Sequence, residues 1–415
     1  MQRVILHCDM NNFYASVECM LNPELKNKPV AVCGSVEERH GIVLAKNYAA
    51  KAFGVSTGEA IWQAKQKCQD LVIVEPHYEQ YMKFSKLARE IYGRYTDQIE
   101  PYGMDECWLD VTGSGCMGTG FEIADEIRRT VKFELGLTIS AGVSFNKIFA
   151  KLGSDYKKPD GITAFTKENY KELLWRLPAA DLLYVGRSTR NTLNRYGIKT
   201  IGELALSDPK FLERLLGKMG LVLYTFANGW DESPVSPQGY EAPVKSIGNS
   251  TTTPRDLENN LDVQIVLMAL AESVAARLRK HGFKCKVVSI SIRDNGLYSF
   301  SRQKKLERPT DITNEIMKAA NELFREHYNW QHPIRSLGVR AESLVLSDIP
   351  IQFNLFVSEE QREKQEKMDQ AVDDIRRRFG YFSVQKAFMY QDKALASLDA
   401  QSSHTVHPIG YFNGR

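Results

Sequence analysis

The feature that most constrains the fold is the stretch YGMDECWLD, in which two adjacent carboxylates, Asp105 and Glu106, precede apolar residues. Trp108 and Leu109 follow the pair, and Ile99 lies just upstream, an alternation typical of a β-strand packed in a sheet. Because adjacent side chains of a strand point to opposite faces, both carboxylates can reach one site only at a turn or at a strand edge. Taken alone, such a pair is more readily interpreted as a solvated acidic turn.

A second strand, at residues 2–8, changes that interpretation. Its sequence QRVILHC is apolar and runs directly into Asp9. Phe13, Val17 and Leu21 then recur at helical spacing, so Asp9 lies where a strand end meets a helix N-terminus. Three carboxylates at the ends of two strands suit a pair of Mg²⁺ ions, which prefer oxygen ligands and leave room for water and phosphates. Two such ions about 3.5–4 Å apart can activate an attacking oxygen and stabilise a leaving oxygen in phosphoryl transfer.

Five motifs follow one another along the chain. They are DMNNFYASVE (9–18), NYAAKAFGV (47–55), MDECWLD (104–110), SAGVSFNKIFAKLGSDYKKPDG (140–161) and VGRSTRNTLNRYGIKTIGEL (185–204). In this order and at these spacings they resemble the Y-family of lesion-bypass DNA polymerases, and more closely its bacterial UmuC/DinB-type members. The resemblance extends from residue 1 to about residue 390. It implies template-directed addition of dNTPs to a primer 3′-OH by two-metal phosphoryl transfer, with low fidelity and without proofreading.

The resemblance also implies an α+β multidomain fold shaped like a right hand. The expected parts are a palm (a sheet backed by helices, 1–11 and 76–167), small fingers (12–75), a helical thumb with helix-hairpin-helix turns (168–233), a linker (234–244), a βαββαβ little finger (245–347) and a C-terminal tail (348–415). Several domains are also expected from the length of 415 residues, because a single core rarely grows beyond about 250–300 residues.

Local patterns predict two helices beside the acidic residues. Apolar residues on one stripe predict a helix over residues 78–96. Ser144 is predicted to cap a helix over residues 145–156, because a serine oxygen can accept a backbone N–H at a helix start.

The resemblance assigns roles to individual residues of this chain. It implies that Asp9, Asp105 and Glu106 are catalytic and, with the Met10 carbonyl, bind two Mg²⁺ ions. It implies that Phe13, Tyr14, Tyr48, Lys51 and Lys158 contact the incoming dNTP.

Two of these nucleotide contacts depart from a simple assignment. Tyr14 matches the aromatic steric gate that excludes a ribose 2′-OH; it could instead be a core tyrosine, although Phe13 is the better candidate for that core position. Many family members carry arginine where this chain has Lys51, and lysine keeps the charge but loses the bidentate fork. Lys157, next to Lys158, is expected on a solvated face.

The expected DNA contacts lie in the thumb and the little finger. The turn Val185-Gly186-Arg187-Ser188 resembles a helix-hairpin-helix turn, in which Gly186 would help to hold a phosphate through backbone N–H groups. Ser188 replaces the usual second glycine, and a plain αα-hairpin is the alternative.

In the little finger, residues 241–347 hold 16 lysines and arginines against 12 aspartates and glutamates. Arg302, Lys304 and Lys305 share one predicted strand with Tyr298 and Phe300. Such a strand face on phosphates would give salt-dependent binding to primer–template DNA with little sequence preference.

Gln352, Leu355 and Phe356 match the QxxLF pattern by which bacterial polymerases of this kind dock on the sliding clamp (the beta subunit). An extended peptide that buries two apolar anchors is a sound way to bind. The alternative is an edge strand that packs on its own domain.

The composition of the chain indicates in which compartment and with which partners it is expected to act. The net charge of +3 is too small to indicate nucleic-acid binding by itself. The seven cysteines show no CxxC pair, which favours reduced thiols in a cytoplasmic protein. No apolar run approaches the roughly 20 residues of a membrane span and no signal peptide opens the chain, so no membrane association is expected. A monomer is expected.

Two other functions compete with a polymerase. Another palm-type phosphoryl transferase, such as a nucleotide cyclase, shares the two-metal carboxylates but needs neither a thumb nor a clamp peptide. A non-catalytic DNA-binding accessory protein of the same fold would require the loss of a carboxylate, and Asp9, Asp105 and Glu106 are all present.

Overall fold

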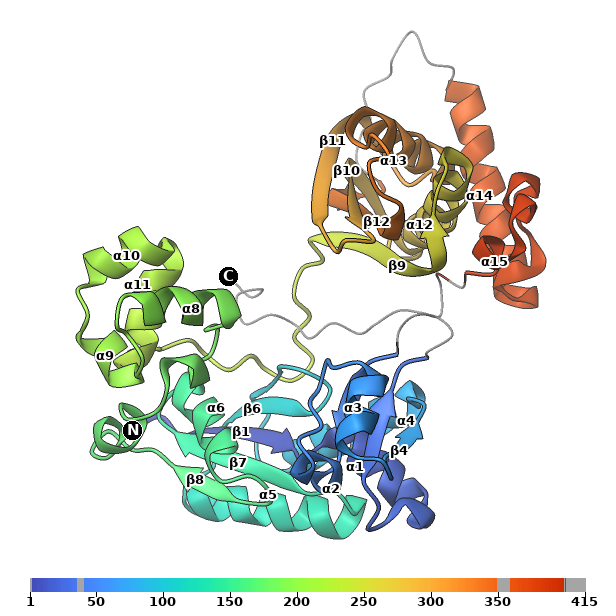
Figure 1. Ribbon diagram of the computed structural model, residues 1–415. Coiled ribbons are helices and arrows are strands. Elements are labelled where there is room, and N and C mark those ends of the chain that lie inside the picture. Colours follow the sequence, from blue (N-terminus) through green and yellow to red (C-terminus); the bar gives the residue numbers. More distant parts are fainter. Residues whose placement is uncertain (1, 36–40, 349–358, 399, 401–415) are drawn as a thin grey trace. The chain divides into compact units, whose positions relative to one another are not determined.

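The computed structural model describes residues 2–35, 41–348, 359–398 and 400. It divides into two compact units, the first ending at Ala242 and the second starting at Pro243 (Figure 1). Among the described helices, none combines the length and the apolar character needed to cross a membrane.

The first unit is built around a five-stranded sheet with the order β5-β6-β1-β7-β8. Its strands are β1 (Ile5–Met10), β5 (Ile99–Pro101), β6 (Glu106–Asp110), β7 (Ile139–Ser144) and β8 (Ile162–Ala164). The central strand β1 runs antiparallel to β6 and β7, whereas β7 and β8 are parallel. Every residue of β1 is buried, so elements cover both faces of this sheet.

Helices on opposite sides cover the two faces (Figure 1). These helices are α4 (Tyr78–Tyr92), α5 (Gly120–Leu135) and α6 (Lys147–Tyr156), with the short 3₁₀ turn η2 (Gly115–Met117) before α5. Leu6, Cys8 and Met10 join the core that α4 and α5 fill. The alternate residues of β1 point the other way, toward α6, since Ile5 packs with Ala150. Asp9 lies on this second face.

Two glycines allow α6 to lie directly on β7. A Cβ atom added to Gly142 would lie 1.9 Å from the Ala150 carbonyl oxygen and 2.5 Å from the Ser154 nitrogen. A Cβ atom added to Gly153 would in turn lie 2.9 Å from Gly142 Cα. The close approach brings the side chains of α6 to the ends of β1 and β6.

The predicted helix cap at Ser144 is wrong. Ser144 is still paired with Ile5 as the last residue of β7, and its hydroxyl donates to the Phe165 carbonyl at 2.9 Å. The chain needs two more residues to leave the sheet, so Asn146 becomes the cap and accepts the Phe149 N–H at 2.8 Å. Strand pairing has overridden a local capping preference.

The helix predicted over 78–96 ends earlier, at Tyr92. The N–H of Gly93 closes the last helical turn on the Arg89 carbonyl. Tyr95 then turns its ring into the core of the sheet, where it is 6% exposed.

A small three-stranded sheet with the order β3-β2-β4 follows the first helix. Its elements are α1 (Phe13–Leu21), η1 (Pro23–Leu25), β2 (Val30–Cys33), β3 (Val43–Lys46), α2 (Tyr48–Ala52), α3 (Ile61–Lys67) and β4 (Val72–Val74). The side chain of Asn47 caps α2 by accepting the Ala50 N–H and also accepts the N–H of Val30. This residue fixes the start of α2 to β2.

A helical cluster completes the first unit. Its elements are α7 (Tyr170–Leu174), η3 (Ala179–Asp181), α8 (Arg187–Arg195), α9 (Ile201–Leu206), α10 (Pro209–Leu216) and α11 (Lys218–Ala227). Leu193, Leu204 and Leu223 are completely buried in its core, which Phe149 of α6 shares.

The expected linker has no regular secondary structure, but its first part is docked on the first unit. Val235 is 4% exposed and packs with Trp108 and Ile5. The Ser236 N–H donates to Glu100 at 2.9 Å, and the Gln238 N–H donates to the Asp97 carbonyl at 2.7 Å. Only the residues after these contacts can act as a tether.

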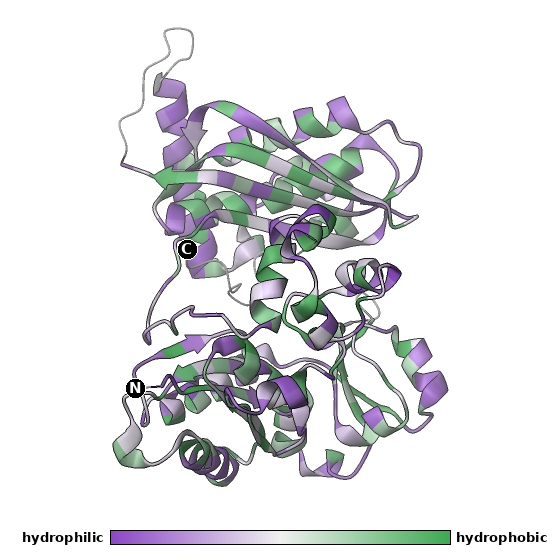
Figure 2. Ribbon diagram, turned by 90° about the vertical axis from the view of Figure 1, so that its left-hand side faces the viewer, coloured by the Kyte–Doolittle hydropathy of each residue, from purple (hydrophilic) through white to green (hydrophobic). Residues whose placement is uncertain are grey.

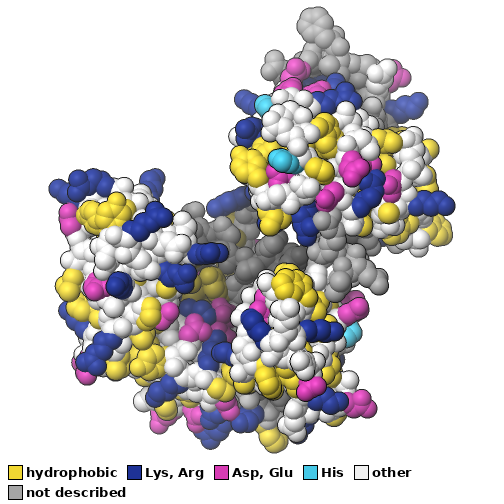
Figure 3. All heavy atoms as spheres, in the orientation of Figure 1, with side chains coloured by type: hydrophobic (Ala, Val, Ile, Leu, Met, Phe, Trp, Pro, Cys, Tyr) yellow, Lys and Arg dark blue, Asp and Glu magenta, His cyan; other side chains and the backbone are white. Residues whose placement is uncertain are grey.

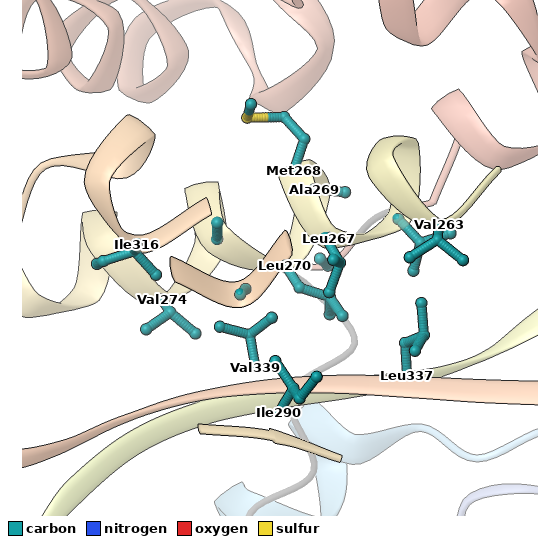
Figure 4. Close-up of a cluster of buried hydrophobic side chains, with 14 of the residues drawn as sticks. Val263, Leu267, Met268, Ala269, Leu270, Val274, Ile290, Ile316, Leu337 and Val339 are labelled. Atoms are coloured by element: carbon teal, nitrogen blue, oxygen red, sulfur yellow. The ribbon is translucent and has the colours of Figure 1, made fainter. Parts of the chain in front are cut away.

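The second unit is an antiparallel sheet with the order β11-β10-β12-β9, on which helices pack. Its elements are β9 (Ser246–Leu257), α12 (Asn260–Lys280), β10 (Phe283–Asp294), β11 (Ser299–Thr310), α13 (Thr313–His327) and β12 (Ile334–Leu346). This is the βαββαβ order expected from the sequence. Hydrophilic and hydrophobic residues alternate along the long strands, and the apolar ones, such as Ile290 and Val339, meet Leu270 of α12 (Figures 2 and 4).

The segment expected as a tail contains a folded part of the second unit. Its elements are α14 (Glu359–Phe379), η4 (Tyr381–Ser383), η5 (Ala387–Gln391) and α15 (Lys393–Ala396). Arg279 of α12 pairs with Asp373 at 2.6 Å, and Glu272 pairs with Arg376 at 2.9 Å. Leu395 is completely buried in the same core as α12. Buried ion pairs and apolar contacts thus attach this segment to the domain.

Candidate active site

Strands β1 and β6 bring the predicted carboxylates together. Asp9 and Glu106 are directly opposite each other in the antiparallel register, so their side chains leave the same face of the sheet. Asp105 immediately precedes β6, and its carbonyl accepts the Met10 N–H at 3.0 Å. The acidic pair therefore lies at the start of a strand. Both carboxylates were expected to reach one site only at such a strand edge or at a turn. Figure 3 shows acidic and basic side chains close together on the surface of the first unit.

Two lysines are bonded to these carboxylates. Lys151 Nζ lies 2.7 Å from Glu106 Oε1 and 3.1 Å from Asp9 Oδ2. Lys158 Nζ lies 2.7 Å from the same Asp9 oxygen. Asp155, one helical turn after Lys151, accepts both ammonium groups, at 3.4 Å from Lys151 and 2.8 Å from Lys158. The result is a closed ring of ion pairs.

Burial and these charges shift the pKa of each carboxyl. Burial alone would raise the pKa of Asp9, but Lys151 and Lys158 outweigh it and hold that pKa low. Burial raises the pKa of Glu106 against the attraction of Lys151, and the charge of Asp9 raises it further. Burial also raises the pKa of Asp105 to about 6, again with a contribution from Asp9. Asp9 is therefore the most firmly ionised of the three.

The donor chemistry of this cluster fits a divalent metal ion. Carboxylate oxygens from two strand ends, with a backbone carbonyl beside them, are the hard oxygen ligands that Mg²⁺ prefers. Within the described residues, however, no group of three or more histidine, cysteine, aspartate or glutamate side chains is arranged to hold a metal ion. One oxygen of Asp9 and one oxygen of Glu106 are bonded to Lys151.

Sequence reasoning missed the role of Lys151 and the buried residue His7. His7 is two residues before Asp9 on the same strand face, with Nδ1 2.9 Å from the Ser154 hydroxyl and Nε2 3.7 Å from Glu106 Oε2. Burial lowers the pKa of His7, so the ring is neutral. The spacing of two residues between His7 and Asp9 was the sequence signal, because it puts both side chains on the same strand face. Lys147, at the start of α6, is buried and bonded to Glu100 at 2.6 Å.

The predicted triphosphate contacts lie beside the carboxylates. Tyr48, the first residue of α2, donates to Asn11 Oδ1 at 3.4 Å, and Lys51 Nζ lies 5.6 Å from the centre of the Tyr48 ring. Burial raises the pKa of Tyr48. The charge of Lys158 lowers this pKa, and the charge of Asp9 raises it. The structure therefore brings Tyr48 close to Lys158 and Asp9, and Lys51 lies beside the Tyr48 ring.

The two aromatic residues of α1 have different surroundings. Phe13 is 3% exposed in the core between α1 and the sheet. Tyr14 stacks on Tyr81 with ring centres 4.2 Å apart and an interplanar angle of 8°, and its hydroxyl points to Met104 Sδ at 3.7 Å. Burial raises the pKa of Tyr14 to about 12, with a contribution from the charge of Asp105. Tyr14 is thus a fixed ring near the acidic cluster, and Phe13 is a core side chain.

In the helical cluster, Gly186 is the N-cap residue of α8 and its carbonyl accepts the Arg190 N–H. A Cβ atom added there would meet nothing within 4 Å, so open space lies beside this helix start. Phosphate binding at this turn remains a prediction.

The three predicted cations of the second unit do not share one strand face. Arg302 and Lys304 are opposite Ile290 and Val288, on the face that the helices cover, and Lys304 pairs with Glu322 of α13 at 2.7 Å. Lys305 lies on the other face. The prediction that the three cations act together is wrong in this respect, because side chains alternate along a strand.

The other face, which the described helices leave uncovered, holds two cations that sequence reasoning missed. Arg340 is opposite Ser289, and Arg293 lies on the same face, opposite Ser299 and Ser336. Gly338 is also there, and a Cβ atom on it would lie 2.4 Å from the Ser291 hydroxyl. The period of two along the strands was the signal that could have separated the faces.

The clamp motif at Gln352, Leu355 and Phe356 lies outside the described residues. Docking on a sliding clamp remains a prediction from the sequence.

Comparisons with known proteins agree on one family. Residues 8–155 match the impB/mucB/samB family, and residues 244–355 match the C-terminal domain of that family. The chain is similar to DNA polymerase IV of Acetivibrio thermocellus, with 54% identity over 396 residues that cover 95% of this chain and 99% of that protein. It is 39% identical to DNA polymerase IV 1 of Bacillus subtilis over 386 residues, 92% of each chain. A solved Y-family DNA polymerase chimera has a similar fold, with a TM-score of 0.73 at 24% identity over 83% of this chain and 99% of that one.

The raised pKa of Asp105 predicts a pH-dependent effect on stability. Folding takes up a proton on this carboxyl between its ordinary pKa of 3.8 and about 6, so the wild type loses stability as the pH rises through that window. Asp105→Asn removes the buried charge. In EDTA, urea unfolding should show the variant more stable by up to about 2–3 kcal/mol at pH 7 and equal to the wild type near pH 4. The exposed substitution Glu90→Gln on α4 is the control, and an equal gain at both pH values would contradict the assignment.

Proposed function

Since this chain belongs to the impB/mucB/samB family, the Y-family of DNA polymerases, we propose that Asp9, Asp105 and Glu106 are the metal-binding carboxylates with which it extends a DNA primer. The protein is a DNA-directed DNA polymerase of the translesion type. The observation that supports the site most directly is the register of β1 and β6, which sets Asp9 opposite Glu106 with Asp105 beside them. A non-catalytic accessory protein is not favoured.

The proposed reaction is an in-line attack of the primer 3′-OH on the α-phosphate of a dNTP, with pyrophosphate as the leaving group. Two bound Mg²⁺ ions would supply a more acidic 3′-OH and neutralise charge on the leaving oxygens. Asp9, Asp105 and Glu106, together with the Met10 carbonyl, would hold these ions. The chain itself contributes position and charge.

The triphosphate is proposed to lie along Tyr48, Lys51 and Lys158. Tyr48 presents a hydroxyl donor, Lys158 presents an ammonium group at Asp9, and the ammonium group of Lys51 lies beside the Tyr48 ring. Lys51 offers a single cationic centre where an arginine would offer two parallel N–H groups. Phosphate binding at this position is therefore expected to depend on charge more than on a fixed geometry.

Tyr14 is proposed to exclude ribonucleotides. Its ring is held by the stack on Tyr81, so it cannot rotate away from a nearby sugar without losing that contact. A ribose 2′-OH placed against such a ring would collide with it.

The second unit is proposed to grip the DNA backbone with its uncovered sheet face. Lys305, Arg293 and Arg340 lie there among serines and a glycine. The acidic residue Glu342 lies on the same face, 4.0 Å from Arg340. Together these residues carry more positive than negative charge, as contact with a phosphate backbone requires. The further proposed partners are a sliding clamp at residues 352–356 and primer–template DNA at Gly186. A monomer in the cytoplasm, low fidelity and the absence of proofreading complete the proposal.

The central test is primer extension with MgCl₂ and dNTPs by the wild type and by the double variant Asp105→Ala, Glu106→Ala. Distributive extension by the wild type should vanish in the variant, because a site without these anionic ligands no longer retains a divalent ion. Primer–template affinity should stay within about threefold, since less than 1 kcal/mol of binding is expected to change. Glu79→Ala, Glu90→Ala removes the same charge from the exposed side of α4 and should extend normally. Extension that survives in the variant would exclude these carboxylates.

Tyr14→Ala should raise incorporation of ribonucleotides relative to deoxyribonucleotides by at least about tenfold, a change of about 1.4 kcal/mol in discrimination. The reason is the loss of the ring that a 2′-OH would strike. Single-nucleotide insertion with rNTPs and dNTPs measures the ratio. Phe133→Ala, an aromatic truncation at a side chain that is 91% exposed on α5, is the control. Unchanged sugar selectivity with intact dNTP insertion would remove Tyr14 from this role.

Lys305→Ala should weaken binding to primer–template DNA and lower the slope of log K against log salt by about one, because one phosphate contact is lost. Lys304→Ala is the matched control: the neighbouring residue has the same charge but is turned to the helix face and paired with Glu322. Fluorescence anisotropy at several salt concentrations measures both. Equal losses in the two variants would contradict a DNA contact limited to the uncovered face.

A further inference from the structure

In the ring of ion pairs around Asp9, the ammonium group of Lys151 contacts two of the carboxylates that are proposed to hold a metal ion. Lys151 is only 14% exposed, and its Nζ bonds to one oxygen of Asp9 and one oxygen of Glu106, two residues that are opposite each other in the register of β1 and β6. A divalent ion held by Asp9 and Glu106 would compete with this ammonium group for the charge of the two carboxylates. Two cations cannot occupy one such position, because like charges at contact distance repel strongly in a buried site.

Asp155 differs from the other carboxylates of the ring. It lies on α6 rather than on a strand end, and its side chain is 49% exposed. It already touches Lys151 at 3.4 Å and Lys158 at 2.8 Å, through different oxygens. Since residues four apart are neighbours on a helix surface, Lys151 can shift from Asp9 to Asp155 by side-chain rotation alone.

We propose that Lys151 is a resident counter-ion that competes with the divalent metal for Asp9 and Glu106, and that Asp155 is the positioning residue that receives it when the metal binds. Before metal binding, the ammonium offsets the repulsion among three crowded carboxylates. When the ion takes their oxygens, Asp155 keeps the displaced charge paired and out of the site. The inference rests on the proposed function of the carboxylates as metal ligands.

The competition makes opposite predictions for the two partners. Without Lys151, a metal ion no longer competes with an ammonium group at Glu106 and competes only with Lys158 at Asp9, so Lys151→Gln should bind Mg²⁺ more tightly. Without Asp155, the displaced ammonium has no acceptor, so Asp155→Asn should bind Mg²⁺ more weakly. If Asp155 acts through Lys151, its substitution should matter less once Lys151 is gone, and the two effects should not be additive. Two independent charges that only alter the local field would give additive effects.

The experiment is thermal unfolding of the full-length protein without DNA or dNTP, first in EDTA and then across a MgCl₂ titration. The half-saturating Mg²⁺ concentration for the rise in Tm should fall at least about fivefold in Lys151→Gln and rise at least about threefold in Asp155→Asn. In EDTA, Lys151→Gln should also have a lower Tm than the wild type. The double variant should show less than half of the Asp155→Asn effect. Lys157→Gln, an exposed lysine of the same segment, should match the wild type.

The Mg²⁺ dependence of Tm in these variants tests the roles of Lys151 and Asp155. A half-saturating concentration that is unchanged or higher in Lys151→Gln, or additive effects in the double variant, would overturn the inference while a Mg²⁺-responsive wild type left the metal site intact. If Lys151→Gln does not fold in EDTA, Asp155→Asn alone is decisive, since an unchanged Mg²⁺ dependence would overturn the role of Asp155. A wild type whose Tm does not respond to Mg²⁺ would overturn both the inference and the proposed metal site.

Discussion

The bonds from the Lys151 ammonium to Asp9 and Glu106 are the interaction on which the active-site structure depends. Three carboxyl groups at the ends of two neighbouring strands repel one another, and burial makes their charges more costly. A cation between two of them offsets that cost. Lys151 can reach this position only because α6 lies directly on β7, an approach that a side chain on Gly142 would prevent. The neutralisation of the carboxylates therefore depends on the close packing of α6 against the sheet.

Much of this site could be predicted because its residues lie at element ends. A strand that runs into Asp9 and a second strand that starts at Glu106 are local patterns, and a short register brings them together. Lys151 and His7 depend instead on which helix covers which face of the sheet, and a single sequence does not state that. The cap at Asn146 was missed for a related reason: pairing with β1 keeps Ser144 in the sheet, although its side chain alone would suit a helix start.

The second unit shows the same limit in a different form. The βαββαβ order was predictable from alternating strands and periodic helices. The separation of Lys304 from Lys305 follows from the period of two, but only the register with Val288 and Val287 shows which face the helices cover. Helix α14 lies in the segment expected as a C-terminal tail, and its mixed-charge sequence does not indicate which surface it packs on. Its attachment through Arg279 and Arg376 uses partners far away in the sequence.

Metal binding and folding place opposite requirements on a cluster of carboxylates such as this one. Tight metal binding favours carboxylates that are close together and free, whereas folding favours carboxylates that are apart or paired. An arginine could also pair with them, but its planar fork would bind two carboxylate oxygens in a fixed geometry and would leave less readily. A lysine is a compact charge on a flexible stem. It can neutralise Asp9 and Glu106 during folding and rotate to Asp155, so the same helix that completes the fold can also clear the site for a metal ion.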